Sequence, residues 1–342
     1  MKRILAALLT PTLLLCGCAA AADTEQTQYT ATFLGLFDTV TTIVGRAGSQ
    51  EDFRAQAQVV HDELLVYHRL FDIYNDYEGL NNLKTVNDQA GIAPVTVDSA
   101  IIALLTDCRR YYDFTGGQVN TAMGSVLQLW HTARSDALDD PRSAYLPDGT
   151  ALRQAAAHTD FDDVIIDADA STVYLSDPQL QLDVGAVAKG WAAQQAAQNA
   201  PEGLLISVGG NVCATGPKDA AGTPWVIGIR DPGGGAEDYL HTIAITGGCV
   251  VTSGDYQRAY TVDGKLYHHI IDPATLYPAN RWRSVTIVCG DSGLADALST
   301  ALFLLPQEQG QALLTQSGAE ALWVDADGAL FYSPGFQDLI RT

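Results

Sequence analysis

The sequence predicts an α+β fold with mixed or antiparallel sheets, flanking helices and two intimately joined lobes. From residue 162 onward, short runs rich in β-branched and aromatic residues recur, and only two helical stretches interrupt them. Strands gathered in one part of a chain favour this class over regular βαβ alternation. No repeat of about 20 to 50 residues is present. Hydrophobic residues make up 47% of the chain, so a single domain over residues 31–342 can bury a large core.

The first half is predicted to begin with strands and continue with helices. Residues 30–47 are rich in β-branched and aromatic residues, which favours a strand pair. Ser49 is placed to cap a helix over residues 51–74, whose first turn is acidic. A second helix is expected over Val97–Phe114, because two glycines follow it closely. Two shorter segments complete this half, a helical turn at 121–131 and a surface loop at 133–150.

The second half is predicted to consist mainly of strands. Its two helices are expected at 186–199 and 293–316, the second one broken near Pro306. The expected strands lie at residues 163–167, 172–176, 203–209, 224–230, 241–246, 249–254, 258–262, 284–289, 320–326 and 329–333.

The first 17 residues have the pattern of a bacterial lipoprotein signal peptide. Lys2 and Arg3 precede an apolar run that ends in Leu15-Cys16-Gly17-Cys18. This ending resembles a lipobox, which predicts cleavage before Cys18 and lipidation of that cysteine. The alternative is an ordinary secretory signal with an incidental cysteine. The lipid would hold the protein at the extracytoplasmic face of the bacterial cell membrane, and the polar residues 18–30 would form a flexible tether.

The chain is strongly acidic. Its formal charge is −21, and removal of residues 1–17 with Lys2 and Arg3 changes it to −23. Nucleic acid and anionic lipid would be repelled, so neither is an expected partner. Beyond Cys18 the mature chain has four widely spaced cysteines and no CxxC pair, which argues against a zinc site. We expect these cysteines to be buried, although a disulfide is possible outside the cytoplasm.

The most informative stretch is Leu182–Gly190, with the sequence LDVGAVAKG. It places Asp183, at the end of an alternating strand-like run, six positions before Lys189, across a Gly-Ala turn that opens a helix. The first turn of a helix exposes unpaired N–H groups at the positive end of the helix dipole, and phosphate-bearing ligands bind well there. Taken alone the motif is short, and a structural turn followed by a solvated lysine would have the same sequence.

Two further segments downstream carry polar groups on turns. Gly209-Gly210-Asn211 follows a predicted strand, and paired glycines let a backbone approach a ligand closely. Ser253–Tyr256 is a polar turn between strands. In the strand that follows, His268 and His269 are adjacent and point to opposite faces, so at most one of them can serve a given pocket.

A third segment, ADALST, brings a carboxylate and a hydroxyl to one helix face. Asp296 and Thr300 are four residues apart. Both are hard oxygen ligands, which suit Mg²⁺. Spacing alone nevertheless favours a local role, in which these side chains satisfy backbone groups near the helix start.

The order of the segments is more specific than any one of them. DxxAxxKG, GGN, SGDY, HHIIDP and ADALST follow one another in a chain that closely resembles the ApbE family of flavin transferases, from Phe33 to about Phe331. The resemblance implies an ApbE-like fold and a Mg²⁺-dependent FAD:protein FMN transferase. Such an enzyme splits FAD at its pyrophosphate, joins FMN through a phosphoester to a Thr or Ser of a target protein, and releases AMP.

The resemblance also implies a role for each matching residue. Asp183 and Lys189 would contact FAD, and the Ala186 carbonyl, Asp296 and Thr300 would bind Mg²⁺. His269 would lie beside the pyrophosphate and Ile270 against the flavin nucleotide. Flavin contacts in the first half are implied at Phe37, Tyr74, Gln118, Val119 and Asn120.

His269, Asp296 and Lys189 are the expected catalytic residues. His269 is the expected base for the acceptor hydroxyl, because the ordinary pKa of histidine lies near the operating pH. Asp255 and Asp272 are alternative bases. Lys189, or His269 when protonated, would offset the charge that develops on the AMP leaving group.

The chain departs from the family pattern at three places. Leu276 stands where the family usually has Gly, and because Leu disfavours positive φ, we expect a reshaped loop. Asn120 stands where many members have Asp, and residues 76–80 replace a serine-containing loop.

Three alternative functions remain at this point. The same site with water as nucleophile would be a FAD pyrophosphatase that yields FMN and AMP. A flavin-binding or solute-binding lipoprotein would bind without catalysis, and an envelope scaffold would bind no flavin. The transferase interpretation further implies an acceptor protein with an S/T-G-A-S/T-like segment. Residues 316–320 of the chain lack the final hydroxyl and are not expected to be a self-modification site.

Overall fold

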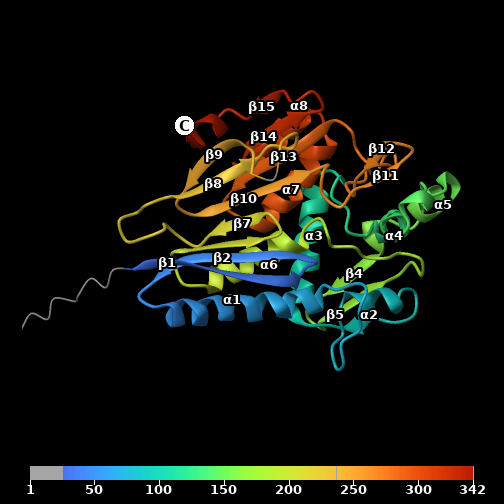
Figure 1. The fold of residues 1–342 in the computed structure, drawn as a ribbon. Helices are drawn as coiled ribbons and strands as arrows, with labels where there is room; N and C mark the ends of the chain where they lie inside the picture. The colour runs from blue at the N-terminus through green and yellow to red at the C-terminus, as the bar shows by residue number, and fades with distance from the viewer. Residues whose placement is uncertain (1–25, 236, 342) are drawn as a thin grey trace, which may run out of the picture.

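The computed structural model describes residues 26–235 and 237–341, and its centre is one large antiparallel sheet (Figure 1). The strand order in this sheet is β1-β2-β6-β7-β10-β13-β14-β15. Neighbouring strands pair antiparallel throughout, which confirms the α+β prediction. The strands are β1 (Thr27–Leu36), β2 (Thr39–Ala47), β6 (Leu204–Val208), β7 (Asn211–Ala214), β10 (Gly248–Gly254), β13 (Trp282–Cys289), β14 (Glu320–Asp325) and β15 (Leu330–Tyr332).

Three smaller sheets surround the large one. Their orders are β16-β9-β8, β3-β5-β4 and β11-β12. Their strands are β3 (Val95–Thr96), β4 (Val164–Asp167), β5 (Thr172–Leu175), β8 (Trp225–Arg230), β9 (Tyr239–Ile245), β11 (Tyr260–Val262), β12 (Lys265–Tyr267) and β16 (Ile340–Arg341). The sheet of β8 and β9 shares a hydrophobic cluster with one face of the large sheet, through residues such as Ile227, Ile243 and Val250.

Helices cover the opposite face of the large sheet. α1 runs along β1 and β2, and α6 and α7 pack against each other and against the central strands (Figure 1). The helices are α1 (Gln50–Leu70), α2 (Leu83–Asp88), α3 (Ser99–Phe114), α4 (Gly124–Asp139), α5 (Gly149–Ala156), α6 (Ala188–Asn199), α7 (Ser292–Leu304) and α8 (Gln307–Ser317). Short 3₁₀ turns lie at Pro141–Ser143, Phe161–Asp163 and Phe336–Leu339.

A shared core joins the two halves of the chain. The largest hydrophobic cluster includes Leu104 of α3, Val173 of β5, Leu298 of α7 and Trp323 of β14. α7 is apolar on nearly all sides and accordingly buried at most of its positions. Because α6 and α7 lie in the middle of this core, the polar groups they present toward a cavity are held rigidly.

Most elements form where the sequence predicts them. The short helices α2 and α5 were not predicted, and α1 ends at Leu70 instead of residue 74. Four further differences are found. β1 begins at Thr27, inside the segment expected to be tether, while the signal peptide and Cys18 lie outside the described residues. α4 continues to Asp139, through part of the expected loop. No strand leads into Asp183, because β5 ends at Leu175. The helix after Asp183 starts at Ala188, two residues later than expected.

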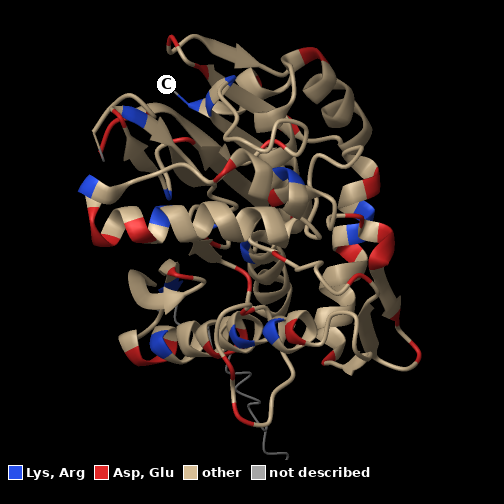
Figure 2. Ribbon diagram, turned by 90° about the vertical axis from the view of Figure 1, so that its right-hand side faces the viewer, with Lys and Arg blue, Asp and Glu red and all other residues tan. Residues whose placement is uncertain are grey.

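The four cysteines of the described chain are free thiols. Cys108, Cys213 and Cys249 are buried, as expected, and Cys289 is half-buried. Cys213 and Cys249 face each other on β7 and β10 with their sulfur atoms 3.1 Å apart. Within the described part of the chain, no helix is long and apolar enough to cross a membrane. Acidic side chains are spread over helices and loops around the molecule (Figure 2).

Candidate active site

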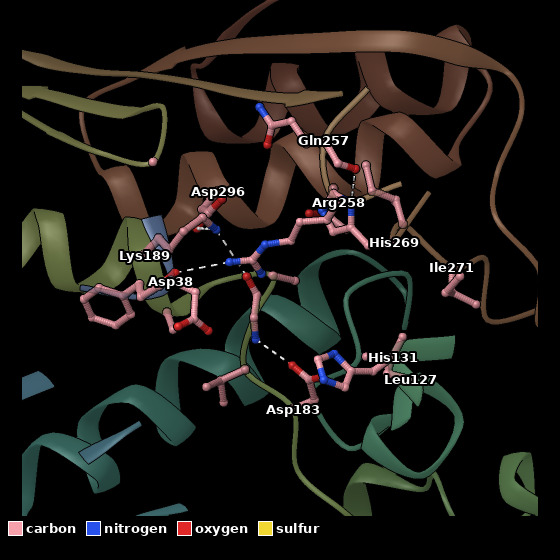
Figure 3. A pocket seen from close by; sticks show the side chains of 18 of the residues that line it. Asp38, Leu127, His131, Asp183, Lys189, Gln257, Arg258, His269, Ile271 and Asp296 are labelled. Atoms are coloured by element: carbon pink, nitrogen blue, oxygen red, sulfur yellow. Dashed lines mark hydrogen bonds and ion pairs between the residues drawn. The ribbon is translucent and has the colours of Figure 1, made fainter. Parts of the chain in front are cut away.

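One cavity of about 890 Å³ gathers every residue that the sequence assigns to ligand or metal. It lies between α4, the start of α6, α7, the β1–β2 hairpin and the loops after β10 and β12. Its lining includes Phe37, Tyr74, Gln118, Val119, Asn120, Asp183, Ala186, Lys189, His269, Ile270, Asp296 and Thr300. Residues more than 260 positions apart in the sequence therefore share one site, and Figure 3 shows how several of them point into it.

The buried end of the cavity is built around the Asp296 carboxylate on α7. Asp296 is 4% exposed. One of its oxygens, Oδ2, accepts the backbone N–H of Gly190 at 2.9 Å and the Asn211 side-chain amide at 3.2 Å. Lys189 Nζ lies 3.5 Å from the same oxygen (Figure 3). Burial raises the pKa of Asp296, and the Lys189 charge opposes that rise. The stretch around Lys189 and the helix of ADALST are thus in direct contact.

Gly190 permits this close approach of α6 and α7. A Cβ atom at this position would lie 2.3 Å from the Ser292 carbonyl oxygen and 2.5 Å from the Asp296 Cβ. Such distances are far inside van der Waals contact. Only glycine therefore lets the first turn of α6 donate its N–H to the carboxylate.

The oxygen atoms around Asp296 suit a small divalent cation. In a regular helix the Gly190 N–H would donate to the Ala186 carbonyl four residues earlier; here it donates to Asp296 instead. Among the described residues no donor to the Ala186 carbonyl or to Asp296 Oδ1 is found. Thr300 lies one turn after Asp296 and also faces the cavity. One carboxylate with two neutral oxygens fits Mg²⁺, which commonly completes its shell with water and substrate phosphate.

No cation site with more charged or imidazole ligands is present in the described part of the chain. It contains no cluster of three or more His, Cys, Asp or Glu side chains placed to hold a metal.

Asp183 is positioned by a residue that sequence reasoning missed. The buried Asn87 of α2 accepts the Leu182 N–H at 2.7 Å and donates to the Leu182 carbonyl at 3.0 Å. The Asp183 N–H donates to the Thr121 carbonyl, and its carboxylate accepts the Gly185 N–H at 2.8 Å. These bonds replace the strand expected before the motif. Burial raises the pKa of the Asp183 carboxyl.

Both histidines line the cavity, contrary to the expectation that only one would, but only His269 is exposed in it. His268 is buried, with Nε2 2.6 Å from the Ala279 carbonyl and Nδ1 accepting the Ile270 N–H. His269 is exposed through the cavity, and its Nδ1 lies 3.2 Å from the Gln257 carbonyl (Figure 3). Both histidines follow β12, which ends at Tyr267, so they are not on the strand that the sequence predicted.

The pKa of His269 is low for a histidine. Desolvation is the main cause, and the positive charges of Arg258 and Lys189 add to it, lowering the pKa to about 3. The imidazole is therefore neutral near pH 7. The two alternative bases do not reach the cavity: Asp255 pairs with Arg283 at 3.3 Å, and Asp272 caps the backbone of Ala274.

The first-half residues form the outer wall. The Tyr74 ring stacks on His131 of α4, with centroids 5.0 Å apart and planes at 24°. Val119 is buried. Asn120 donates to the Thr159 carbonyl and accepts the Ala122 N–H, so local backbone engages its amide. No pattern in the sequence indicates that His131 would stack here.

The β1–β2 hairpin closes one side of the cavity with a strained turn. Phe37 and Asp38 are its two loop residues, and both have φ 52°. Two-residue turns with positive φ at both positions normally contain Asn and Gly. The Phe37 N–H donates to His68 Nδ1 at 3.2 Å, and the Phe37 carbonyl accepts from Arg258 at 3.2 Å. A bulky residue held in this conformation points to a functional constraint.

The expected reshaping of the loop after HHIIDP is wrong. Leu276 has φ 64°, the conformation that glycine would adopt there. Its N–H donates to the Asp272 carbonyl at 2.7 Å and its carbonyl accepts from the Trp130 indole at 2.9 Å. Its side chain packs against an apolar cluster around Trp130. Packing and these two bonds hold the turn in spite of the strain.

The chain has the fold of the flavin transferases, a class of α+β enzymes. The chain belongs to the ApbE family, whose model matches residues 29–323. It is 37% identical to an FAD:protein FMN transferase of Treponema pallidum over 76% of this chain and 75% of the relative. It is 34% identical to one of Klebsiella pneumoniae over 75% of this chain and 80% of the relative.

Solved structures agree with this assignment. An ApbE protein of Thermotoga maritima superposes with a TM-score of 0.81 at 30% identity. The match covers 92% of this chain and 100% of the other. A flavin transferase ApbE of Vibrio cholerae has the same fold, with a TM-score of 0.75 at 23% identity and coverage of 92% and 99%.

Proposed function

We propose that this protein is an FAD:protein FMN transferase that moves FMN from FAD onto a Ser or Thr hydroxyl of a target protein. The observation that carries the proposal is the contact of Asp296, Gly190 and Lys189 at the end of a cavity whose wall also holds His269. This arrangement combines a cation site, a fixed positive charge and a neutral base. Phosphoryl transfer needs these groups, because its catalysis comes mainly from positioning and charge neutralisation.

Asp296, Thr300 and the Ala186 carbonyl would hold Mg²⁺. When bound, the ion would neutralise charge on the diphosphate of FAD. Lys189 would contribute a second positive charge on the same side, and Gly190 and Asn211 fix the carboxylate so that one oxygen remains available. Asp183 and Ile270 would contact the nucleotide, and Phe37, Tyr74, Gln118, Val119 and Asn120 would surround the flavin.

His269 would remove the proton of the acceptor hydroxyl. A carbonyl only accepts hydrogen bonds, so the contact with Gln257 places the ring proton on Nδ1 and leaves the Nε2 lone pair free. The acceptor oxygen forms a bond to the FMN phosphorus, the P–O bond to AMP breaks, and the hydroxyl proton passes to Nε2. Because His269 is neutral in the free protein, Lys189 is the better candidate to offset charge on departing AMP.

The acceptor would present its hydroxyl on an extended S/T-G-A-S/T-like segment at the mouth of the cavity. We further propose that Cys18 carries a lipid after removal of residues 1–17, which would place enzyme and acceptor at the extracytoplasmic face of the cell membrane. The net charge of −21 agrees with an acceptor that is neither nucleic acid nor an acidic membrane surface.

The test is a reaction of purified protein with FAD, Mg²⁺ and a candidate acceptor protein, followed by mass spectrometry of the acceptor. We expect an acceptor mass increase that equals FMN less one water, together with equimolar AMP. His269→Gln and Asp296→Asn should each lose at least roughly a hundredfold in rate. His61→Gln is the matched control, because His61 lies on α1 outside the cavity lining, and it should retain full activity.

Two outcomes would change the assignment. Free FMN that accumulates from FAD without an acceptor, and no acceptor modification, would identify a FAD pyrophosphatase. Tight flavin binding that is independent of Mg²⁺, with no AMP from any acceptor, would identify a passive flavin-binding lipoprotein.

A further inference from the structure

Two arginines in the cavity have no assigned role and no acidic partner. Arg134 lies on α4 and Arg258 on the loop after β10, and both line the cavity. Within the described residues neither makes an ion pair within 4 Å, although Asp38 and Asp183 line the same cavity. Arg134 Nε is buried and has no hydrogen-bond partner there. Leaving buried donors unpaired is costly unless a ligand pairs with them.

The backbone aims each arginine into the cavity. Leu127, His131 and Arg134 are spaced i, i+4 and i+7 on α4, so they share one helix face, and all three line the cavity. Arg258 has φ 43°, which is unusual for a residue other than glycine. Its side chain crosses the cavity and donates to the Phe37 carbonyl at 3.2 Å (Figure 3). A strained residue that reaches across a ligand cavity is typical of a binding role.

The charge of the surroundings makes this pair unusual. The chain has 19 Lys and Arg against 40 Asp and Glu. Arg134, Arg258 and Lys189 nevertheless converge on one cavity. Lys189 already has Asp296 within 3.5 Å, whereas burial and the nearby Arg258 charge lower the pKa of Arg134. This arrangement favours an anion, and the local positive field attracts one in spite of the acidic surface.

We propose that Arg134 and Arg258 form a metal-independent anion subsite in the same cavity, which contacts the diphosphate of a dinucleotide or nucleoside diphosphate in addition to the groups around Asp296. Planar guanidinium groups bind phosphate oxygens through paired hydrogen bonds, a geometry that the ammonium group of lysine cannot reproduce. The inference deepens the proposed function, since FAD is the diphosphate the enzyme would use. Arg258 also links the anion to the β1–β2 hairpin. A phosphate that binds the Arg258 guanidinium would compete with its hydrogen bond to the Phe37 carbonyl.

The arginine site and the Asp296 cation site lead to different predictions about metal dependence. Anion binding by the arginines should persist in excess EDTA, whereas binding through Asp296 and Thr300 requires the metal. ADP carries the diphosphate without a flavin, and riboflavin carries the flavin ring without phosphate. Together these two probes separate phosphate recognition from ring recognition.

The experiment is calorimetric titration of ADP and of riboflavin into the full chain in EDTA. Wild type should bind ADP, with affinity that falls as salt rises. Arg258→Gln and Arg134→Gln should each weaken ADP binding by roughly tenfold, with riboflavin affinity unchanged. Arg258→Lys should recover only part of the loss. The matched control, Arg142→Gln, alters a 92% exposed arginine outside the cavity and should bind ADP as wild type does.

An Arg134→Gln, Arg258→Gln double variant that binds ADP within twofold of wild type would overturn the inference. Asp296→Asn is an additional check: it should retain metal-free ADP binding, and loss of that binding would also count against a metal-independent subsite. Melting curves of each variant show whether it is folded. Transferase activity is measured separately, so an inactive protein that still needs both arginines for ADP would contradict the proposed function and leave this inference standing.

Discussion

The Gly190 backbone N–H donates to Asp296 Oδ2 at 2.9 Å, and this bond links the two helices on which the site depends. The first turn of a helix has N–H groups with no partner inside the helix. One of them here satisfies a buried carboxylate, which itself carries the negative charge that a helix N-terminus stabilises. The Ala186 carbonyl lies just before the helix and accepts no backbone hydrogen bond within the described chain. The contact therefore orients the acid beside a second available oxygen.

Gly190→Ala should push α6 and α7 apart. The added methyl would meet the Ser292 carbonyl at 2.3 Å, and because that neighbour is backbone of α7, it cannot rotate away. We expect a loss of about 1–3 kcal/mol in the free energy of unfolding, measured by urea denaturation, and Mg²⁺-dependent activity below about 1% of wild type. Gly247→Ala is the control, since a Cβ there meets nothing within 4 Å. Normal activity in Gly190→Ala would show that α6 and α7 need not touch.

Phe37→Asn should stabilise the protein and weaken flavin binding. Asn tolerates positive φ better than Phe, so relief at φ 52° should raise the free energy of unfolding by about 0.5–1 kcal/mol. Loss of the aromatic ring from the cavity wall should lower FAD affinity by roughly tenfold. Thermal melting and flavin fluorescence titration measure the two effects.

Asp38→Gly serves as the comparison for Phe37→Asn. It relieves the same kind of strain at the next residue without removing a ring, so it should stabilise with little change in FAD affinity. If Phe37→Asn left FAD affinity intact, the strain at Phe37 would have no connection with the ligand.

The pH dependence should differ between the free enzyme and the FAD complex. In the free protein the His269 pKa is lowered to about 3, so the base stays deprotonated at any pH above that value. The profile of kcat/KM, which reports the free enzyme, should therefore show no acidic fall from His269 between about pH 5 and pH 8. Bound diphosphate adds negative charge that offsets Arg258 and Lys189, so the His269 pKa should rise and an acidic limb should move into the kcat profile.

The measurement is a pair of pH-rate profiles for wild type and for Arg258→Gln. Removing this positive charge should raise the His269 pKa, so the acidic limb of the kcat profile, which reports the FAD complex, should lie at higher pH in Arg258→Gln than in wild type. Superimposable profiles for the two proteins would mean that Arg258 does not act on the base.

Helix caps and helix faces could be predicted from local sequence patterns. Contacts between residues far apart in the sequence could not. Ser49 caps α1 through its hydroxyl, as its position before an acidic first turn indicates. Asp296 and Thr300 share a helix face as their spacing requires. By contrast, the bonds between Asn87 and Leu182 join residues 95 positions apart. No periodicity in either segment indicates such a pairing.

Leu276 shows why a local rule can fail within a tertiary structure. The rule that Leu avoids positive φ is correct as a preference. The Trp130 indole bond and the apolar contacts around it nevertheless hold Leu276 at φ 64°. Arg134 and Arg258 carry no sequence signal for a related reason: a lone arginine does not indicate whether an acid or a ligand will face it.

Asn87→Leu tests how strongly the fold depends on one buried amide. The two side chains are similar in volume, but Leu cannot pair with the Leu182 N–H and carbonyl, which would both be left buried without partners. Each such group costs about 1–3 kcal/mol, so we expect the free energy of unfolding to fall by about 2–5 kcal/mol. Because the freed segment leads directly into Asp183, FAD affinity should fall as well. The control is Asn81→Leu, which removes one bond from an exposed amide to the Thr96 carbonyl and should cost less than about 1 kcal/mol. Equal stability of the two variants in urea would show that the Asn87 bonds do not hold the Asp183 segment in place.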